Sequence, residues 1–269
     1  MAEQYKYLNS FIDEQRAKGK YSFTTEGLHT HLGVSENALK KSLQRLKSQE
    51  LVVMVRREFY VIIPPEYRAK GIIPTSLYVS DLMKFLNRDY YVGLLNAAAY
   101  HGAAHQQPQN YTVITEGIAL RPIKNNKVGI NFYIKKSWNR EDVIKKKVDA
   151  GYINISSPEL TALDLVSYYN EVGGFNRIAT VIEELKEAIQ PKKLVETAKQ
   201  YEEISVVQRL GYVLECVLEE QSLSDTLYNY LESIGHYPTL LRPQKKKPES
   251  MMTGNRWKIV PNVEIEADI

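Results

Sequence analysis

The residues with the clearest potential for chemistry lie between positions 35 and 50. Amide, hydroxyl and basic side chains recur there at the spacing of one helix face, with no acid among them: Asn37, Lys41, Gln44 and Ser48 along its middle, and Lys40, Arg45 and Lys47 on its flanks. Such side chains contact base edges or phosphate groups, and an ordinary solvated helix seldom omits acids so consistently. The pattern favours nucleic-acid binding over the alternative, a small helical domain with an ordinary charged surface.

Two short helices joined by a turn are the elements that would position this face. The second helix has an apolar side formed by leucines at helical spacing, Leu39, Leu43 and Leu46. Ser35 is suited to cap its first turn, and Thr24 or Thr25 to cap the helix before it. Gly33 supplies the tight turn between them. This order predicts a helix-turn-helix.

Two β-rich runs, 51–55 and 59–63, follow the second helix and are joined through Arg56, Arg57 and Glu58. They predict a β-hairpin with a basic tip, and the pattern of residues 3–18 predicts a helix that packs across the other two. The segment resembles a winged helix-turn-helix DNA-binding domain. The residues expected to contact DNA lie on its second helix and its hairpin tip: Ser35, Asn37, Lys40, Lys41, Gln44, Arg45, Arg56 and Arg57.

Charge is unevenly distributed along the 269 residues. Residues 1–63 hold ten Lys or Arg and seven Asp or Glu, whereas the remainder holds 25 of each. The formal excess of +3 therefore lies wholly in the segment expected to bind DNA.

Composition is that of an ordinary globular protein, with room for two domains. No stretch approaches the roughly 18 apolar residues that a membrane span requires, and residues 1–4 lack the features of a secretory signal. The single cysteine, Cys216, excludes an internal disulfide and fits a reducing compartment. We expect a cytoplasmic protein, with Cys216 buried in a helix.

The chain divides at a proline-rich stretch, residues 64–74, which cannot continue a helix or a strand. We predict an α+β protein: an N-terminal domain over residues 1–70, then a larger mixed α/β, mostly helical domain over 75–269. The second domain is expected to hold short strands within 109–155, helices over 157–220 and a tail over 222–269. Within it, residues 91–102 predict a buried helix, and residues 135–147 form a strongly basic segment.

Two motifs of the second domain carry a family resemblance. One is the apolar, small-residue stretch Tyr91-Val92-Gly93-Leu94-Leu95-Asn96-Ala97-Ala98-Ala99-Tyr100-His101-Gly102; the other is the capped helix start Ser157-Pro158-Glu159-Leu160-Thr161-Ala162-Leu163-Asp164-Leu165-Val166. With the preceding winged segment, they resemble the AbiEi-type antitoxins, regulators of abortive-infection (type IV) toxin–antitoxin systems. The resemblance implies repression at the protein's own promoter and action against a nucleotidyltransferase-like toxin.

Enzyme sites are not evident in the sequence. His101 and His105 are one helical turn apart, but the glutamate of an H-E-x-x-H zinc site is missing and no third ligand is marked. Cys216 lacks a marked histidine partner, and the paired acidic metal ligands of a nucleotidyltransferase are absent. We therefore expect no enzymatic activity, no cofactor and no metal.

Two other functions remain open from the sequence. One is an effector-responsive transcriptional regulator without antitoxin activity. The other is an RNA-binding protein that uses tyrosines beside basic runs such as residues 135–147, because aromatic faces near cations can hold single strands.

Overall fold

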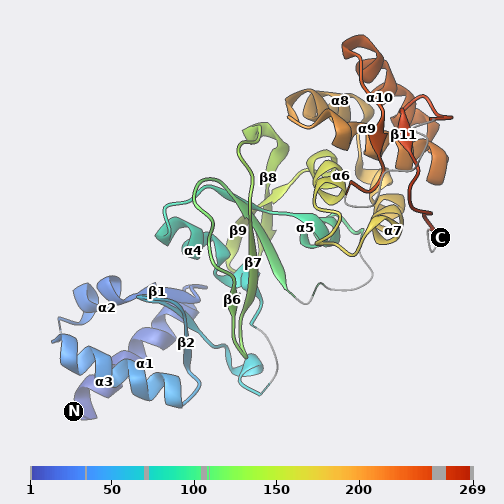
Figure 1. Cartoon of the computed structure of the whole chain (residues 1–269). Coiled ribbons are helices and arrows are strands. Elements are labelled where there is room, and N and C mark those ends of the chain that lie inside the picture. Colours follow the sequence, from blue (N-terminus) through green and yellow to red (C-terminus); the bar gives the residue numbers. More distant parts are fainter. Residues whose placement is uncertain are drawn as a thin grey trace. The chain divides into compact units, whose positions relative to one another are not determined.

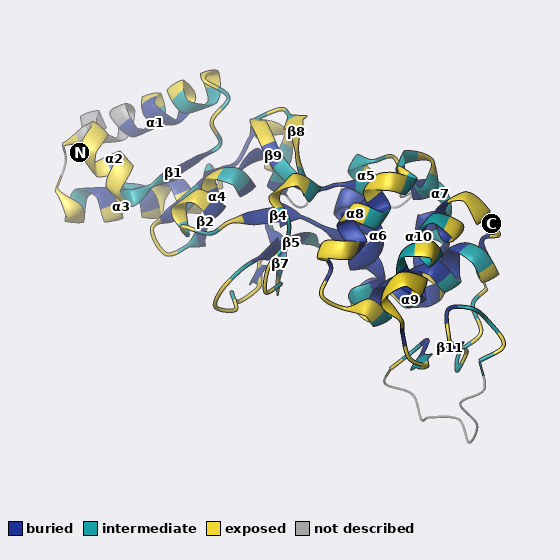
Figure 2. Cartoon of the chain, turned by 90° about the horizontal axis from the view of Figure 1, so that it is seen from above, coloured by how far each residue is buried: buried dark blue, intermediate teal, exposed yellow. Residues whose placement is uncertain are grey.

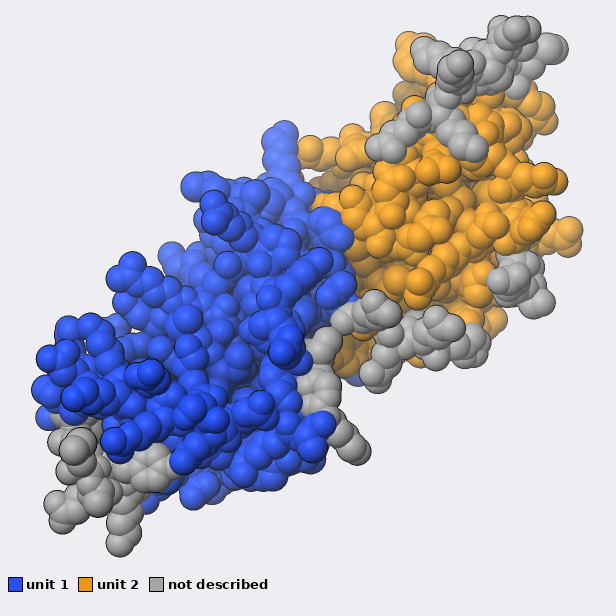
Figure 3. All heavy atoms as spheres, turned by 60° about the horizontal axis from the view of Figure 1, so that its bottom comes forward, with its two compact units in different colours: residues 1–91, 109–136, 145–154 blue, residues 92–108, 137–144, 155–269 orange. Residues whose placement is uncertain are grey.

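The computed structural model describes residues 2–33, 35–69, 73–103, 108, 110–243 and 253–266, without the side chains of residues 2–7 and 32. The chain forms two compact units, coloured separately in Figure 3. Unit 1 comprises residues 1–91, 109–136 and 145–154, and unit 2 comprises residues 92–108, 137–144 and 155–269.

Unit 1 begins with three helices and three strands, all but β3 labelled in Figure 1. In chain order they are α1 (Ala2–Ala17), β1 (Ser22–Thr24), α2 (Thr25–Leu32), α3 (Glu36–Ser48), β2 (Val52–Arg56) and β3 (Phe59–Ile62). The strands form an antiparallel sheet in the order β1-β3-β2. Between these helices and the sheet lies one apolar core, made of Leu8, Phe11, Ile12, Phe23, Leu28, Leu39, Leu43, Leu46, Val52 and Ile62. The sequence predicted the three helices, the β2–β3 hairpin and the inward-facing leucines of α3, but it did not predict the strand β1.

The other face of this small sheet packs against the rest of unit 1. The ring of Phe59 lies 5.3 Å, between centroids, from Phe85 of α4 (Val79–Phe85). Ser22 donates a hydrogen bond of 2.6 Å to Asp81 on the same helix. Residues on both sides of positions 70–75 therefore pack against each other. The domain boundary that the sequence predicts at these positions remains a prediction.

A second sheet has six strands in the order β6-β7-β5-β4-β9-β8. Their bounds are β4 Tyr90–Val92, β5 Tyr111–Thr115, β6 Ile123–Lys124, β7 Gly129–Ile134, β8 Val143–Val148 and β9 Gly151–Ser156. β5 pairs with β7 in parallel and β6 pairs with β7 antiparallel. Buried side chains such as Val113, Ile130 and Ile153 form its core. The described residues thus form a mixed α/β structure, as the sequence predicted.

Unit 2 is mostly helical. Its helices are α5 (Leu94–Tyr100), α6 (Pro158–Ser167), α7 (Phe175–Leu185), α8 (Pro191–Gln200), α9 (Ile204–Tyr212), a π-helical turn (Val213–Val217) and α10 (Gln221–Ile234). Short 3₁₀ turns lie at Pro65–Tyr67, Thr75–Leu77, Arg140–Asp142 and Lys186–Ala188 across the two units. As expected, Ser157 caps α6 by accepting from the Leu160 N–H at 3.2 Å, with Pro158 in the first turn.

Two stretches differ from the sequence-based prediction. Residues 91–102 were expected to be one helix, but Tyr90–Val92 is the strand β4 and the helix begins only at Leu94. The stretch is apolar on all sides, so its periodicity cannot distinguish a buried strand from a buried helix. The basic segment 135–147 contains most of β8, which was not predicted because its lysines replace the apolar alternation of a strand.

The C-terminal segment packs against the helices of unit 2, of which it is a part. Its strand β11 (Ile259–Val260) pairs in parallel with β10 (Thr239–Leu240), a shorter strand than the run 257–265 predicted. Trp257 is completely buried and donates from its indole N–H to the carboxylate of Glu215. Among the helices that the structure describes, none is long and apolar enough to cross a membrane.

Candidate nucleic-acid interface

Side-chain caps and a glycine turn fix the position of α3. The Thr24 hydroxyl oxygen accepts from the Gly27 N–H at 3.0 Å at the start of α2, and Ser35 accepts from the Ala38 N–H at 3.4 Å at the start of α3. Gly33 ends α2 in the left-handed conformation, with φ 61°, and its N–H donates to the His29 carbonyl. These three predictions are confirmed. The turn that orients α3 is therefore determined by residues close to it in the sequence.

Burial divides α3 into two sides. Its leucines Leu39, Leu43 and Leu46 are buried in the core described above. The residues predicted from α3 and its cap are all exposed: Ser35, Asn37, Lys40, Lys41, Gln44 and Arg45. The structure therefore brings these six together on the free side of one helix.

Among the residues that the structure describes, three of the four α3 cations, Lys41, Arg45 and Lys47, form no ion pair. In the described part of the chain, neither Lys41 nor Arg45 forms an ion pair, whereas Lys40 lies 3.8 Å from Glu36, one turn earlier. Both members of the Lys40–Glu36 pair are largely exposed, and such pairs contribute little. Lys41 and Arg45 thus leave a positive charge open to an anionic partner.

A hollow of about 680 Å³ lies beside this face, between α2, α3 and the β2–β3 hairpin. Leu39, Leu43 and the 41% exposed Met54 supply apolar surface. Its rim carries three acids and three bases, Glu26, Glu36 and Glu58 with Lys40, Lys47 and Arg57. The three acids and Met54 were not among the predicted site residues, although Glu36 and Lys40 have the spacing of a helical ion pair.

The two hairpin arginines differ in their surroundings. The Arg57 side chain is 94% exposed and lies 3.6 Å from Glu58. Arg56 is half-buried: its guanidinium donates to the carbonyl of Arg121 and lies 5.6 Å from the ring centroid of Phe132. Burial, with a smaller effect of Arg121, lowers the pKa of Arg56. The Arg57 side chain is therefore more accessible than that of Arg56, and a DNA contact by either arginine remains a prediction.

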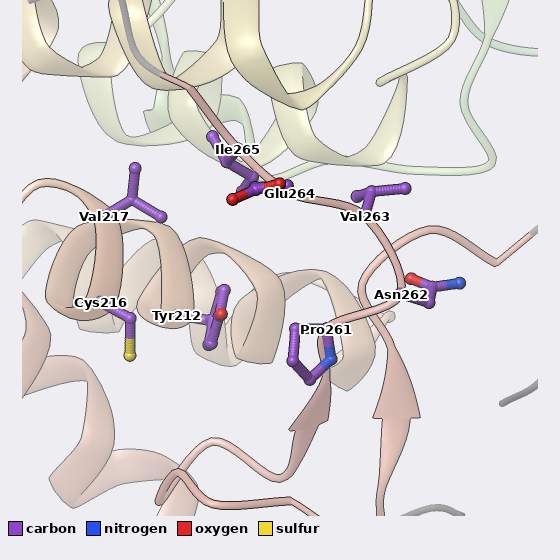
Figure 4. Close-up of a pocket in the computed structure, with 8 residues that line it drawn as sticks. All are labelled: Tyr212, Cys216, Val217, Pro261, Asn262, Val263, Glu264 and Ile265. Atoms are coloured by element: carbon purple, nitrogen blue, oxygen red, sulfur yellow. The ribbon is translucent and has the colours of Figure 1, made fainter. Parts of the chain in front are cut away.

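Other reactive side chains lie outside this face. His101 Nε2 is 2.8 Å from the carbonyl oxygen of Ser156, and His105 is outside the described residues. No group of three His, Cys, Asp or Glu able to hold a metal occurs among the residues described. Cys216, expected to be buried, is exposed, and it is one of the residues that line a hollow together with Tyr212, Val217 and residues 261–265 (Figure 4).

The central part of the chain matches a known protein family. The family model described as the AbiEi antitoxin C-terminal domain matches residues 91–216. A search of curated proteins gives no match. Among solved structures, the crystal structure of the RV2827C protein from Mycobacterium tuberculosis is similar, with a TM-score of 0.67 and 14% identity over 94% of this chain and 90% of that chain. That likeness shows a shared fold. Over residues 91–216, this chain is therefore similar to the C-terminal domain of the AbiEi antitoxins.

Proposed function

We propose that residues 1–63 form a winged helix-turn-helix that binds operator DNA at the protein's own promoter and represses transcription. The observation that carries this proposal is the free side of α3, where Asn37, Lys41 and Arg45 are exposed, while the opposite side is anchored by buried leucines. An exposed helix of this kind, with a hairpin beside it, fits the major groove of a duplex.

The side chains divide by their chemistry. Asn37, Lys41 and Gln44 lie along the middle of the free side, so we assign them to base edges. Lys40, Arg45 and Arg57 lie at its flanks and on the hairpin tip, where they would hold phosphates. Arg56 is left out of the interface because its guanidinium is already engaged by Arg121 and Phe132.

We further propose that the domain over residues 91–216 counteracts a nucleotidyltransferase-like toxin of a type IV abortive-infection system. The match to the antitoxin family supports this role. In the proposal the chain acts by binding, without catalysis, cofactor or metal, and it does so in the cytoplasm. Co-expression with the product of the neighbouring gene is the direct test: the full chain should restore growth that the neighbour arrests, and continued arrest at normal protein levels would refute the antitoxin role.

The repressor role is tested by substitutions on α3. Lys41→Ala or Gln44→Ala should weaken operator binding by about 1–3 kcal/mol and relax sequence preference, because a base contact is lost. Titrations against operator and random duplexes measure both effects. Lys20→Ala, at an exposed lysine after α1, is the matched control and should change neither. An equal loss on operator and random DNA would exclude the base-contact role.

A further inference from the structure

The β8–β9 hairpin carries an exposed surface to which the two proposed activities assign no individual residue. β8 is an end strand of the six-stranded sheet, and its residues Ile144 to Lys147 are all exposed. In Figure 2 exposed residues are visible at β8, whereas β4 in the same sheet is dark blue. An end strand leaves the backbone groups along one of its edges unpaired within the sheet.

Three consecutive lysines, Lys145, Lys146 and Lys147, occupy this strand. In the described part of the chain, Lys145 and Lys147 form no ion pair. Successive strand residues point to opposite faces, so Lys145 and Lys147 share one face and Lys146 lies on the other. Both sides of the edge therefore carry positive charge.

Tyr152, on the adjacent strand β9, is 61% exposed. Its ring has no stacking or hydrogen-bond partner among the residues described. Its backbone, in contrast, is held in place: the carbonyl of Tyr152 accepts from the Ser80 hydroxyl at 2.8 Å, and Ser80 is 2.6 Å from the hydroxyl of Tyr90. The neighbours Ile153 and Ile155 are buried, so the strand is anchored while the Tyr152 face stays open.

We infer that Tyr152 and the β8 lysines form a binding site for single-stranded nucleic acid. An exposed aromatic face can stack on an unpaired base, and nearby cations can neutralise the phosphates on either side of it. A duplex keeps its bases stacked on one another, so it offers no base face to Tyr152. Lysines on an edge strand can also serve to prevent the strand from pairing with another chain. That role explains the lysines, but it does not explain the exposed ring of Tyr152 beside them.

The experiment measures fluorescence anisotropy of the full chain with labelled 12-nucleotide strands of one pyrimidine-rich sequence, as RNA, as DNA and as the DNA duplex. Tyr152→Ala should weaken single-strand binding by about fivefold or more, because one base–aromatic stack is lost. Tyr152→Phe keeps the ring and should restore binding. Tyr237→Ala, at a tyrosine that is 87% exposed in unit 2, is the matched control and should have no effect. The RNA and DNA strands show which sugar the site prefers.

A second readout locates the contact. RNA that carries 5-iodouracil should cross-link on irradiation to the peptide that contains Tyr152, and the cross-link should disappear in Tyr152→Ala. Unchanged binding by Tyr152→Ala would overturn the inference. So would displacement of RNA by poly-glutamate at equal charge concentration, since the surface would then be a site for acidic peptides. Tyr152→Ala should leave operator binding intact, and Lys41→Ala should leave single-strand binding intact, so failure of one proposal is distinguishable from failure of the other.

Discussion

Arg56 and Arg57 are adjacent in the sequence but have different physical roles at the scale of single residues. The Arg57 side chain is 94% exposed, so a phosphate can approach it without displacing any protein group other than the weakly held Glu58. The Arg56 guanidinium is desolvated and hydrogen-bonded to a backbone carbonyl. For Arg56 to contact DNA, that bond and its position over Phe132 would have to be given up.

Alanine substitutions of this pair should separate phosphate binding from folding. Arg57→Ala should weaken binding to all duplexes alike and lower the slope of log K against log salt concentration by about one unit, because one phosphate contact is lost. Arg56→Ala should leave that slope unchanged and instead lower the free energy of unfolding by about 1–2 kcal/mol, since a charged hydrogen bond is removed. Salt titrations and urea unfolding measure the two effects. If Arg56→Ala also lowers the salt slope, Arg56 contacts a phosphate and is part of the DNA interface.

At the scale of the element, the sequence was most informative where local signals agree. Ser35 and Gly33 act on their own helix ends, so α2 and α3 were predictable from neighbouring residues alone. The strand β4 was not, because Tyr90, Tyr91 and Val92 are all buried and have no polar alternation. In the candidate site, the leucines and the exposed polar face were predicted from helical spacing. The engagement of Arg56 was not, since Arg121 and Phe132 are far away in sequence.

Within unit 2, the C-terminal segment is held to α9 by close packing of Trp257 against Gly211. A Cβ atom built on Gly211 would overlap the indole ring of Trp257. The indole also donates to Glu215, and the same carboxylate lies 2.9 Å from the Arg256 guanidinium. Gly211 is therefore required by the close approach of another side chain.

Gly211→Ala should lower the free energy of unfolding by about 1–3 kcal/mol, because an extra methyl group in a packed interior forces its surroundings to shift. Thermal unfolding, followed by the fluorescence of the buried Trp257, gives the loss. Gly254→Ala is the matched control in the same segment, where an added Cβ meets nothing within 4 Å. Equal effects of both substitutions would show that backbone flexibility, not the indole contact, sets the requirement for glycine at 211.

At the scale of the whole molecule, the structure changes how the two proposed activities should be separated. The sequence suggests a cut at residue 75, but Phe59 and Ser22 pack on Phe85 and Asp81 of the same unit. Lys127 also donates to the carbonyls of Tyr67 and Arg68. A truncated chain would lose these contacts and expose Phe85 further, so its failure to act would not reveal which surface is needed. Point substitutions on the exposed side of α3 avoid that ambiguity, because they remove no packing.

The full chain with Lys41→Ala and Gln44→Ala should lose repression of its promoter while it still restores growth in the presence of the toxin. The reason is that both side chains are exposed on α3, whereas the antitoxin family match begins only at residue 91. A promoter–reporter fusion measures repression, colony counts on toxin induction measure neutralisation, and immunoblots must show equal protein levels. The Lys20→Ala chain should keep both activities. If the double variant fails to restore growth at equal abundance, neutralisation depends on the α3 surface itself, and the two activities share one site.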